Sequence, residues 1–246
     1  MTVLADVGMV AADTTRSRAY LQAMVCHGLH PAFVLILDNA GGALLPGQGK
    51  PGLEPHGADT GEWSEADFDP ASDLQSLLRA ADIPYALAPS KDINNPAVLG
   101  MMAVRPESVF VYSGYGGVLL RKDALSVGKR FLHVHGGYLP DFKGSTTNYY
   151  SLLLENTMGA SAIFLTEEID SGPVLHRRKF APPENRQEID HIYDSAARAK
   201  VLVEVLSKYA ETGAWTFELE NNHGGETYYV IHPLLKHLAI LAKDKI

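Results

Sequence analysis

The sequence predicts an α/β fold with a mostly parallel, twisted sheet, helices on both faces of that sheet and a short C-terminal extension. Continuous apolar runs such as Phe33–Leu37 and Val109–Tyr112 are typical of strands that are buried on both faces. Amphipathic stretches with helix-capping residues lie between these runs. Because strand, helix and strand in this order form a parallel βαβ unit, the pattern favours a parallel sheet covered on both sides.

Composition restricts the classes of protein to which this chain can belong. Of its 246 residues, 46% are apolar and 20% are charged, so it can bury a sizeable core. The net charge of −8 argues against nucleic acid or an anionic membrane as a partner, since both require clustered Lys and Arg. No run reaches the ~18 apolar residues of a membrane span, and the N-terminus lacks the pattern of a secretory signal. The single cysteine, Cys26, fits a reducing cytoplasm, and its apolar helical surroundings predict a core position.

The first 134 residues supply most of the predicted sheet. Val3–Val10 predicts the first strand, and Asp13–Thr15 can cap a helix that ends at Gly28. Residues 39–70 are rich in Gly, Pro and acidic side chains and predict a long loop insertion, for which both a disordered excursion and an acceptor-binding lid stay open. The remaining elements are a helix capped by Ser72, a strand over Ile83–Leu87, a helix opened by Asn95-Pro96, the strand Val109–Tyr112, a short helix within Val118–Val127 and a strand over Lys129–Val134.

The second half of the chain predicts fewer and longer elements. Ser145–Thr147 can cap a helix that ends near Gly159. Strands are expected over Ala160–Leu165 and Val174–Phe180, and the longest helical pattern covers Glu188–Tyr209. The tail contains a strand-like segment over Thr227–Ile231 and a short apolar segment after it.

Polar clusters follow three of these strands. His133 and His135 lie two residues apart at a strand end, so their side chains face the same way. An acidic turn over Thr166–Pro173 follows one helix and one strand later. The glycine-rich Ser113–Gly117 ends another strand, where it either lets a ligand approach the backbone or forms a plain tight turn. Ligands of open α/β sheets bind at the carboxyl ends of the strands, so these clusters are candidate site residues.

The histidine pair has several interpretations. Each histidine could be a hydrogen-bonded core residue. Together with Asp141 or Asp170 the pair could form a three-ligand zinc or iron site. The protein would then be a metal-dependent hydrolase, or the site would be structural. The pair could also move protons, because the unperturbed pKa of histidine lies near 6.5.

Two stretches favour the last interpretation because they resemble a known family. HVHGGYLPDFKG (His133–Gly144) and GASAIFLTEEIDSGPVL (Gly159–Leu175) are similar to the catalytic core of the folate-dependent formyltransferases. The resemblance implies a Rossmann-like sheet and transfer of a formyl group from N10-formyltetrahydrofolate to an amine, without a metal. A catalytically altered relative that only binds folate or a nucleotide remains the alternative.

The resemblance also implies roles for individual residues. His135 matches the catalytic histidine of the family and Asp170 its catalytic aspartate. His133 stands where the family has an asparagine that helps to hold the formyl oxygen, and Gly136-Gly137 replaces Pro-Ser; both are departures. The implied folate pocket comprises Ser113, Gly114, Tyr115, Gly116, Gly117, Val118, Glu167, Glu168 and Ile169.

The acceptor implied by the resemblance is a small molecule, most simply a nucleotide-linked amino sugar. The turn Gly8–Arg16 departs from the phosphate-binding turn of the glycinamide ribonucleotide enzymes, and the acidic chain lacks the basic C-terminal domain of the tRNA enzymes. The candidate acceptor contacts are Arg16, Arg18, Lys143, Asn148 and Tyr149. We expect a cytoplasmic enzyme with a catalytic domain over residues 1–210 and a tail, 211–246, that packs on this domain or on the partner subunit of a homodimer.

Overall fold

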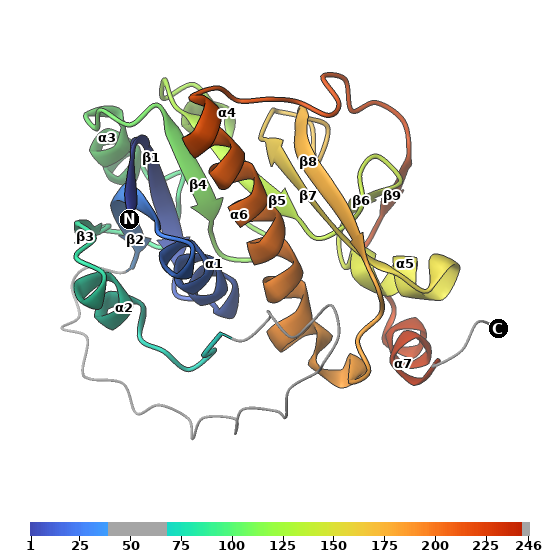
Figure 1. Cartoon of the computed structure of the whole chain (residues 1–246). Helices are drawn as coiled ribbons and strands as arrows, with labels where there is room; N and C mark the ends of the chain where they lie inside the picture. The colour runs from blue at the N-terminus through green and yellow to red at the C-terminus, as the bar shows by residue number, and fades with distance from the viewer. Residues whose placement is uncertain (39–67, 243–246) are drawn as a thin grey trace. The chain divides into compact units, whose positions relative to one another are not determined.

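The computed structural model describes residues 1–38 and 68–242, which form two compact units (Figure 1). The first unit contains residues 1–38 and 68–133, and the second contains residues 134–242. Nearly all of the insertion predicted at 39–70 lies outside the described residues. The tail predicted from residue 211 belongs to the second unit, and the domain boundary at residue 210 stays a prediction.

Parallel strands form the sheet of the first unit, in the order β3-β2-β1-β4-β5. The apolar runs of the sequence fall on its central strands, β1, β2 and β4, whose residues are almost all buried. This arrangement confirms the mostly parallel α/β class. The strands are β1 (Thr2–Ala12), β2 (Leu29–Leu37), β3 (Tyr85–Leu87), β4 (Val109–Ser113) and β5 (Arg130–His135).

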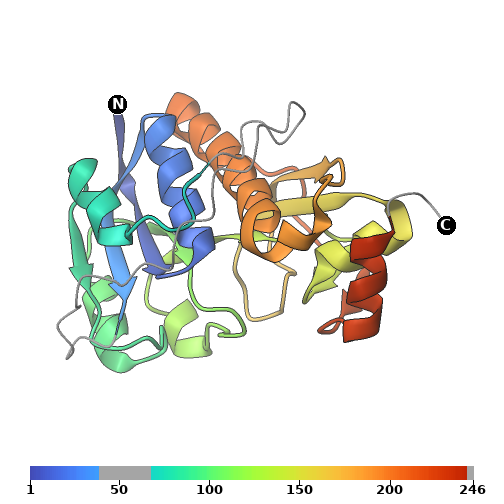
Figure 2. The same cartoon turned by 90° about the horizontal axis from the view of Figure 1, so that it is seen from below.

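Helices cover both faces of this sheet (Figure 2). Right-handed crossovers place α1 and α2 on one face, and α3 and α4 on the other because the strand order reverses at β1. The carboxyl ends of β1 and β4 therefore flank the point where ligands bind in open α/β sheets. The helices are α1 (Thr15–Cys26), α2 (Leu74–Ala80), α3 (Pro96–Ala103) and α4 (Lys122–Leu125).

The second unit combines an antiparallel strand pair with the C-terminal helices. β7 pairs with β8 from Met158 opposite Phe180 onward, and the long helix α6 packs on both strands (Figure 1). A separate parallel pair joins β6 to β9 of the tail, and α7 packs against α5. The elements are β6 (Phe142–Gly144), α5 (Thr147–Glu155), β7 (Met158–Phe164), β8 (Val174–Phe180), a 3-10 turn (Arg186–Glu188), a π-helical turn (Ile189–Tyr193), α6 (Asp194–Thr212), β9 (Glu226–Tyr228) and α7 (Pro233–Leu241).

Several local predictions differ from the structure. Asp73, rather than Ser72, caps α2, because its carboxylate accepts the hydrogen bond from the Ser76 amide. Cys26 is exposed at the end of α1, so the predicted core position is wrong. α5 ends at Glu155, where Asn156 takes a left-handed conformation, and not near Gly159. No helix within residues 1–38 and 68–242 is long and apolar enough to cross a bilayer.

Candidate active site

His135 and Asp170 form a buried pair in the second unit. The His135 Nδ1 atom lies 3.3 Å from Asp170 Oδ1, and only 6% and 10% of the two side chains are exposed. On its other side the His135 Nε2 atom is 2.8 Å from the Phe142 carbonyl oxygen. The Asp170 Oδ2 atom accepts a 2.8 Å hydrogen bond from the Gly144 amide. The predicted catalytic histidine and aspartate are thus brought together, far apart in sequence as they are.

The partners of the His135 ring decide its hydrogen-bonding role. A carbonyl oxygen only accepts, so the Nε2 atom must donate to Phe142. The Nδ1 atom faces a carboxylate oxygen, which also accepts when it is ionised. Nε2 is therefore fixed as a donor, and Nδ1 is the ring atom that the carboxylate contacts. A histidine beside a carboxylate is a common combination for moving protons in acid–base catalysis.

Two glycines give this pair its space. A Cβ atom on Gly137 would lie 2.7 Å from His135 Nε2 and 2.6 Å from the Phe142 oxygen, so a side chain there would displace the ring. Gly144 has φ +96°, which glycine adopts without strain, and this conformation directs its amide toward Asp170. The departure at Gly137 is therefore part of the geometry of the site.

Lys143 and the tail complete the surroundings of Asp170. The Lys143 ammonium is buried and donates to the Asn222 carbonyl at 2.7 Å and to the Ser171 hydroxyl at 3.3 Å. The Asn222 side-chain amide donates to the Asp170 carbonyl at 2.6 Å. Asn222 was not predicted as a site residue, because no local pattern distinguishes it from the exposed Asn221 beside it.

The predicted folate turn of the first unit is fixed by the start of α1. The Ser17 hydroxyl lies 2.8 Å from the Ser113 hydroxyl, and Arg16 Nε donates to that same hydroxyl at 3.2 Å. Arg16 also donates to the Gly114 carbonyl. Gly116 and Gly117 form an exposed tip of the turn, whereas Ser113 is fully buried. Arg16 therefore supports this turn, and Ser17 is a supporting residue that the sequence did not reveal.

His133 lies at the same end of the first unit. Its Nδ1 atom is 3.4 Å from the Tyr112 carbonyl, and its ring is tilted against the Tyr112 ring at 6.2 Å between centroids. Burial raises the pKa of Tyr112 to about 12, so this phenol stays neutral near pH 7. Among the described residues, no group of three or more His, Cys, Asp or Glu side chains is arranged to hold a metal ion.

The second half of the predicted folate pocket is a solvent-exposed arm. Glu167, Glu168 and Ile169 are exposed directly before the buried Asp170, and 54% of Ile169 is accessible. Asp170 itself has φ +51°, a left-handed conformation that is uncommon outside glycine and that changes the direction of the chain at this residue. The role of Glu167, Glu168 and Ile169 in folate binding stays a prediction.

The other predicted acceptor contacts have partners inside their own units. Arg18 is 2.6 Å from Asp13 and donates to the Pro70 carbonyl at 2.8 Å. Asn148 is buried and bridges Asp194 and the Gly159 amide, at 2.9 and 2.8 Å. Burial and a hydrogen bond with Asp190 raise the pKa of Tyr149, which is also buried. The role of these three residues in acceptor binding stays a prediction.

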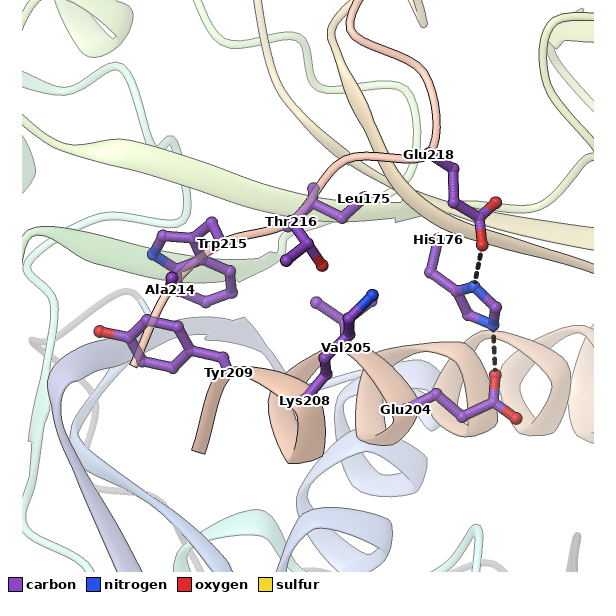
Figure 3. Close-up of a pocket in the computed structure, with 10 residues that line it drawn as sticks. All are labelled: Leu175, His176, Glu204, Val205, Lys208, Tyr209, Ala214, Trp215, Thr216 and Glu218. Atoms are coloured by element: carbon purple, nitrogen blue, oxygen red, sulfur yellow. Dashed lines mark hydrogen bonds and ion pairs between the residues drawn. The ribbon is translucent and has the colours of Figure 1, made fainter. Parts of the chain in front are cut away.

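A separate cavity of about 240 Å³ lies between β8, α6 and the segment 214–218 (Figure 3). His176 projects from β8 between two carboxylates, with Glu204 at 2.8 Å and Glu218 at 2.5 Å. Trp215 stacks on Tyr209 with ring centroids 3.9 Å apart. Because neither His135 nor Asp170 lines this cavity, it is distinct from the candidate active site.

Known proteins are similar to this chain in sequence and in fold. A methionyl-tRNA formyltransferase from Lactiplantibacillus plantarum is 26% identical over 141 residues, which are 56% of this chain and 44% of that protein. A mitochondrial formyltetrahydrofolate deformylase from Arabidopsis thaliana is 28% identical over 109 residues, which are 44% and 33% of the two chains. The chain thus spans less than half the length of these relatives.

Structural similarity extends over more of the molecule. The chain is similar to a solved sugar N-formyltransferase from a Shewanella species, with a TM-score of 0.55 and 12% identity over 96% of this chain and 86% of that one. A sequence model described as formyl transferase matches residues 70–206, more than half of the chain. This segment contains the histidine pair, the predicted folate turn and Asp170. The chain therefore belongs to the formyl transferase family.

Proposed function

We propose that this protein transfers the formyl group of N10-formyltetrahydrofolate to the amine of a small acceptor, most simply a nucleotide-linked amino sugar. The observation that carries this proposal is the buried pair of His135 and Asp170 within the segment that matches the family. The proposed place of this reaction is the cytoplasm, and the proposed partners are small molecules. The fold shared with a sugar N-formyltransferase is consistent with the acceptor but does not define it.

The proposed reaction needs groups that handle one proton and one oxyanion. The amine nitrogen bonds to the formyl carbon, the bond from that carbon to N10 breaks, and the proton that the amine loses ends on N10. His135 would stabilise the oxyanion or shuttle this proton, and Asp170 would orient His135 and balance its charge. His133 would supply a second donor to the oxyanion; one such donor is commonly worth ~10²–10³ in rate.

The decisive experiment offers purified protein N10-formyltetrahydrofolate with a panel of 3-amino and 4-amino nucleotide sugars. Mass spectrometry should detect a product that carries one additional formyl group. The matched controls are Asp170→Asn and His135→Ala, which should lower turnover by at least about 100-fold while the circular dichroism spectrum stays that of the wild type. Near-normal turnover of Asp170→Asn would remove this residue from the mechanism.

Two other outcomes would lead to different functions. The similarity to a formyltetrahydrofolate deformylase makes water an alternative acceptor, and formate would then form without any amine. Tight folate binding without turnover on any acceptor would support a relative whose activity was lost with the change to His133. Formyl transfer to some other amine would exclude the sugar and retain the reaction class.

A further inference from the structure

Asn222 lies in the segment between α6 and β9, outside the residues that match the family. Only 1% of it is exposed, although the neighbouring Asn221 is exposed. Its amide donates to the Asp170 carbonyl at 2.6 Å, and its own backbone carbonyl accepts from the Lys143 ammonium at 2.7 Å. One tail residue therefore contacts both chain segments that surround the candidate catalytic carboxylate.

The Asp170 backbone needs such a contact because of its conformation. A left-handed φ of +51° is unfavourable for a residue with a side chain, so the surrounding structure must favour it. Two hydrogen bonds do so from opposite ends of the residue. The Gly144 amide donates to the side chain, and Asn222 donates to the carbonyl. Without the second bond, the peptide after Asp170 can rotate and turn the carboxylate away from His135.

The second contact of Asn222 acts on the strand that provides the Gly144 amide. Lys143 directly precedes Gly144 in β6, and its buried ammonium is held by Asn222 and by the Ser171 hydroxyl. Ser171 directly follows Asp170. The Lys143 ammonium thus links β6 to the turn that contains Asp170. Asn222 contacts Lys143 of β6 and Asp170 of the turn.

We propose that Asn222 is a positioning residue, which fixes the Asp170 carboxylate against His135 from the C-terminal tail. This inference rests on the proposed function only for what the pair does in catalysis. The Asn222 side-chain oxygen is buried and accepts from no group that the structure describes. Since an unpaired buried acceptor lowers stability, replacing this amide should alter the geometry of the pair more than the stability of the fold.

The test compares Asn222→Ala and the similarly sized Asn222→Leu, both of which lack the N–H donor and add no charge, with Asn221→Ala as the matched control. The first measurement needs no substrate: nitrogen NMR of ¹⁵N-histidine-labelled protein, with the His135 signals assigned by their loss in His135→Gln. Both Asn222 variants should shift the His135 Nδ1 signal, and Asn221→Ala should leave it in place. The second measurement is steady-state kinetics. In both Asn222 variants kcat should fall by about 10-fold to 100-fold, and KM should change by less than about 3-fold.

The outcomes separate this inference from the proposed function. Unshifted His135 signals in both folded Asn222 variants would overturn the positioning role, whatever the enzyme activity is. A wild-type protein that transfers no formyl group would overturn the proposed function, while the NMR comparison would still decide the positioning role. If Asn222→Ala unfolds, Asn222→Leu fills the same volume without a donor and supplies the same comparison.

Discussion

His133 is the residue at which the site departs most from the family that it resembles. Its Nδ1 atom is 3.4 Å from the Tyr112 carbonyl, so the ring is oriented by the backbone of the neighbouring strand. An asparagine is shorter but offers the same donor and acceptor groups. We expect His133→Asn to retain or increase formyl transfer, as measured by kcat/KM against the wild type. A folded but inactive variant would show that the imidazole has a role that an amide cannot fill.

Gly137 matters because it has no side chain, which leaves room for the His135 ring. A methyl group at this position would meet the Phe142 oxygen and His135 Nε2 within 2.7 Å. We expect Gly137→Ala to lower the free energy of unfolding by about 1–3 kcal/mol, as measured by urea denaturation. Gly100 in α3 has open space around it, so Gly100→Ala should instead raise that free energy by about 0.5–1 kcal/mol. Equal effects would contradict the close approach at Gly137.

At this scale the sequence predicted the central residues but not their support. The resemblance to the family implied His135 and Asp170 as catalytic partners, and the structure brings these two side chains together. Asn222 and Ser17 were missed because their role depends on contacts between distant segments. Neither residue type nor spacing carries that information.

His176 joins three elements of the second unit: β8, α6 and the segment after α6. Hydrogen bonds with Glu204 and Glu218 raise its pKa above the usual 6.5, against the effect of burial. Burial raises the pKa of Glu204, but its bonds with His176 and Arg178 outweigh this and lower it. The stabilising contribution of a histidine with a raised pKa is complete below its unfolded value and is lost as pH rises through the folded value.

The second unit should therefore lose stability from about pH 6.5 upward, apart from other titrating groups. Arg177, Arg178 and Lys208 are further charged side chains close to His176 and its two carboxylates. We expect Tm to fall more steeply between about pH 6 and about pH 9 in the wild type than in His176→Gln. The side chains of His176, Glu204 and Glu218 are each about a third exposed. High salt should therefore weaken the difference in Tm between the two proteins. Parallel curves would contradict a charged link.

Long elements with a regular apolar pattern were predicted from the sequence more accurately than short elements. The buried strands and the long helix α6 were predicted because apolar runs and 3.6-residue patterns are local signals. β6 was missed and β9 was placed too long, since each has three residues and is defined by pairing with the other. The cap of α2 was misassigned between adjacent Ser72 and Asp73, both of which are good capping residues.

The C-terminal helix α7 presents several apolar side chains to solvent. Leu234, Leu238 and Leu241 of α7 are 61%, 44% and 57% exposed, at helical spacing on one side. Tyr229 and Val230 before this helix are 81% and 75% exposed. Exposed apolar side chains that are this close in the chain are typical of association sites, which supports the proposed homodimer.

Light scattering after size-exclusion chromatography tests this assembly. The wild type should have the mass of a dimer, and Leu234→Glu with Leu238→Glu should have that of a monomer. Leu154→Glu, at an exposed leucine of α5, is the matched control and should leave the dimer intact. A monomeric wild type, or a double variant that stays dimeric, would exclude α7 as the contact.

The parallel pairing of β6 with β9 has a consequence for how the protein is made. Phe142 pairs with Glu226 and Gly144 with Tyr228, and the Asp170 contact comes from Asn222. During translation His135 and Asp170 leave the ribosome well before these partners do. The nascent chain can already form the βαβ units of its N-terminal half, but the Asn222 hydrogen bond to Asp170 and the pairing of β6 with β9 form only after residues 222–228 emerge. Activity should therefore appear only after this segment has cleared the exit tunnel, and ribosome-bound chains stalled before it should be inactive.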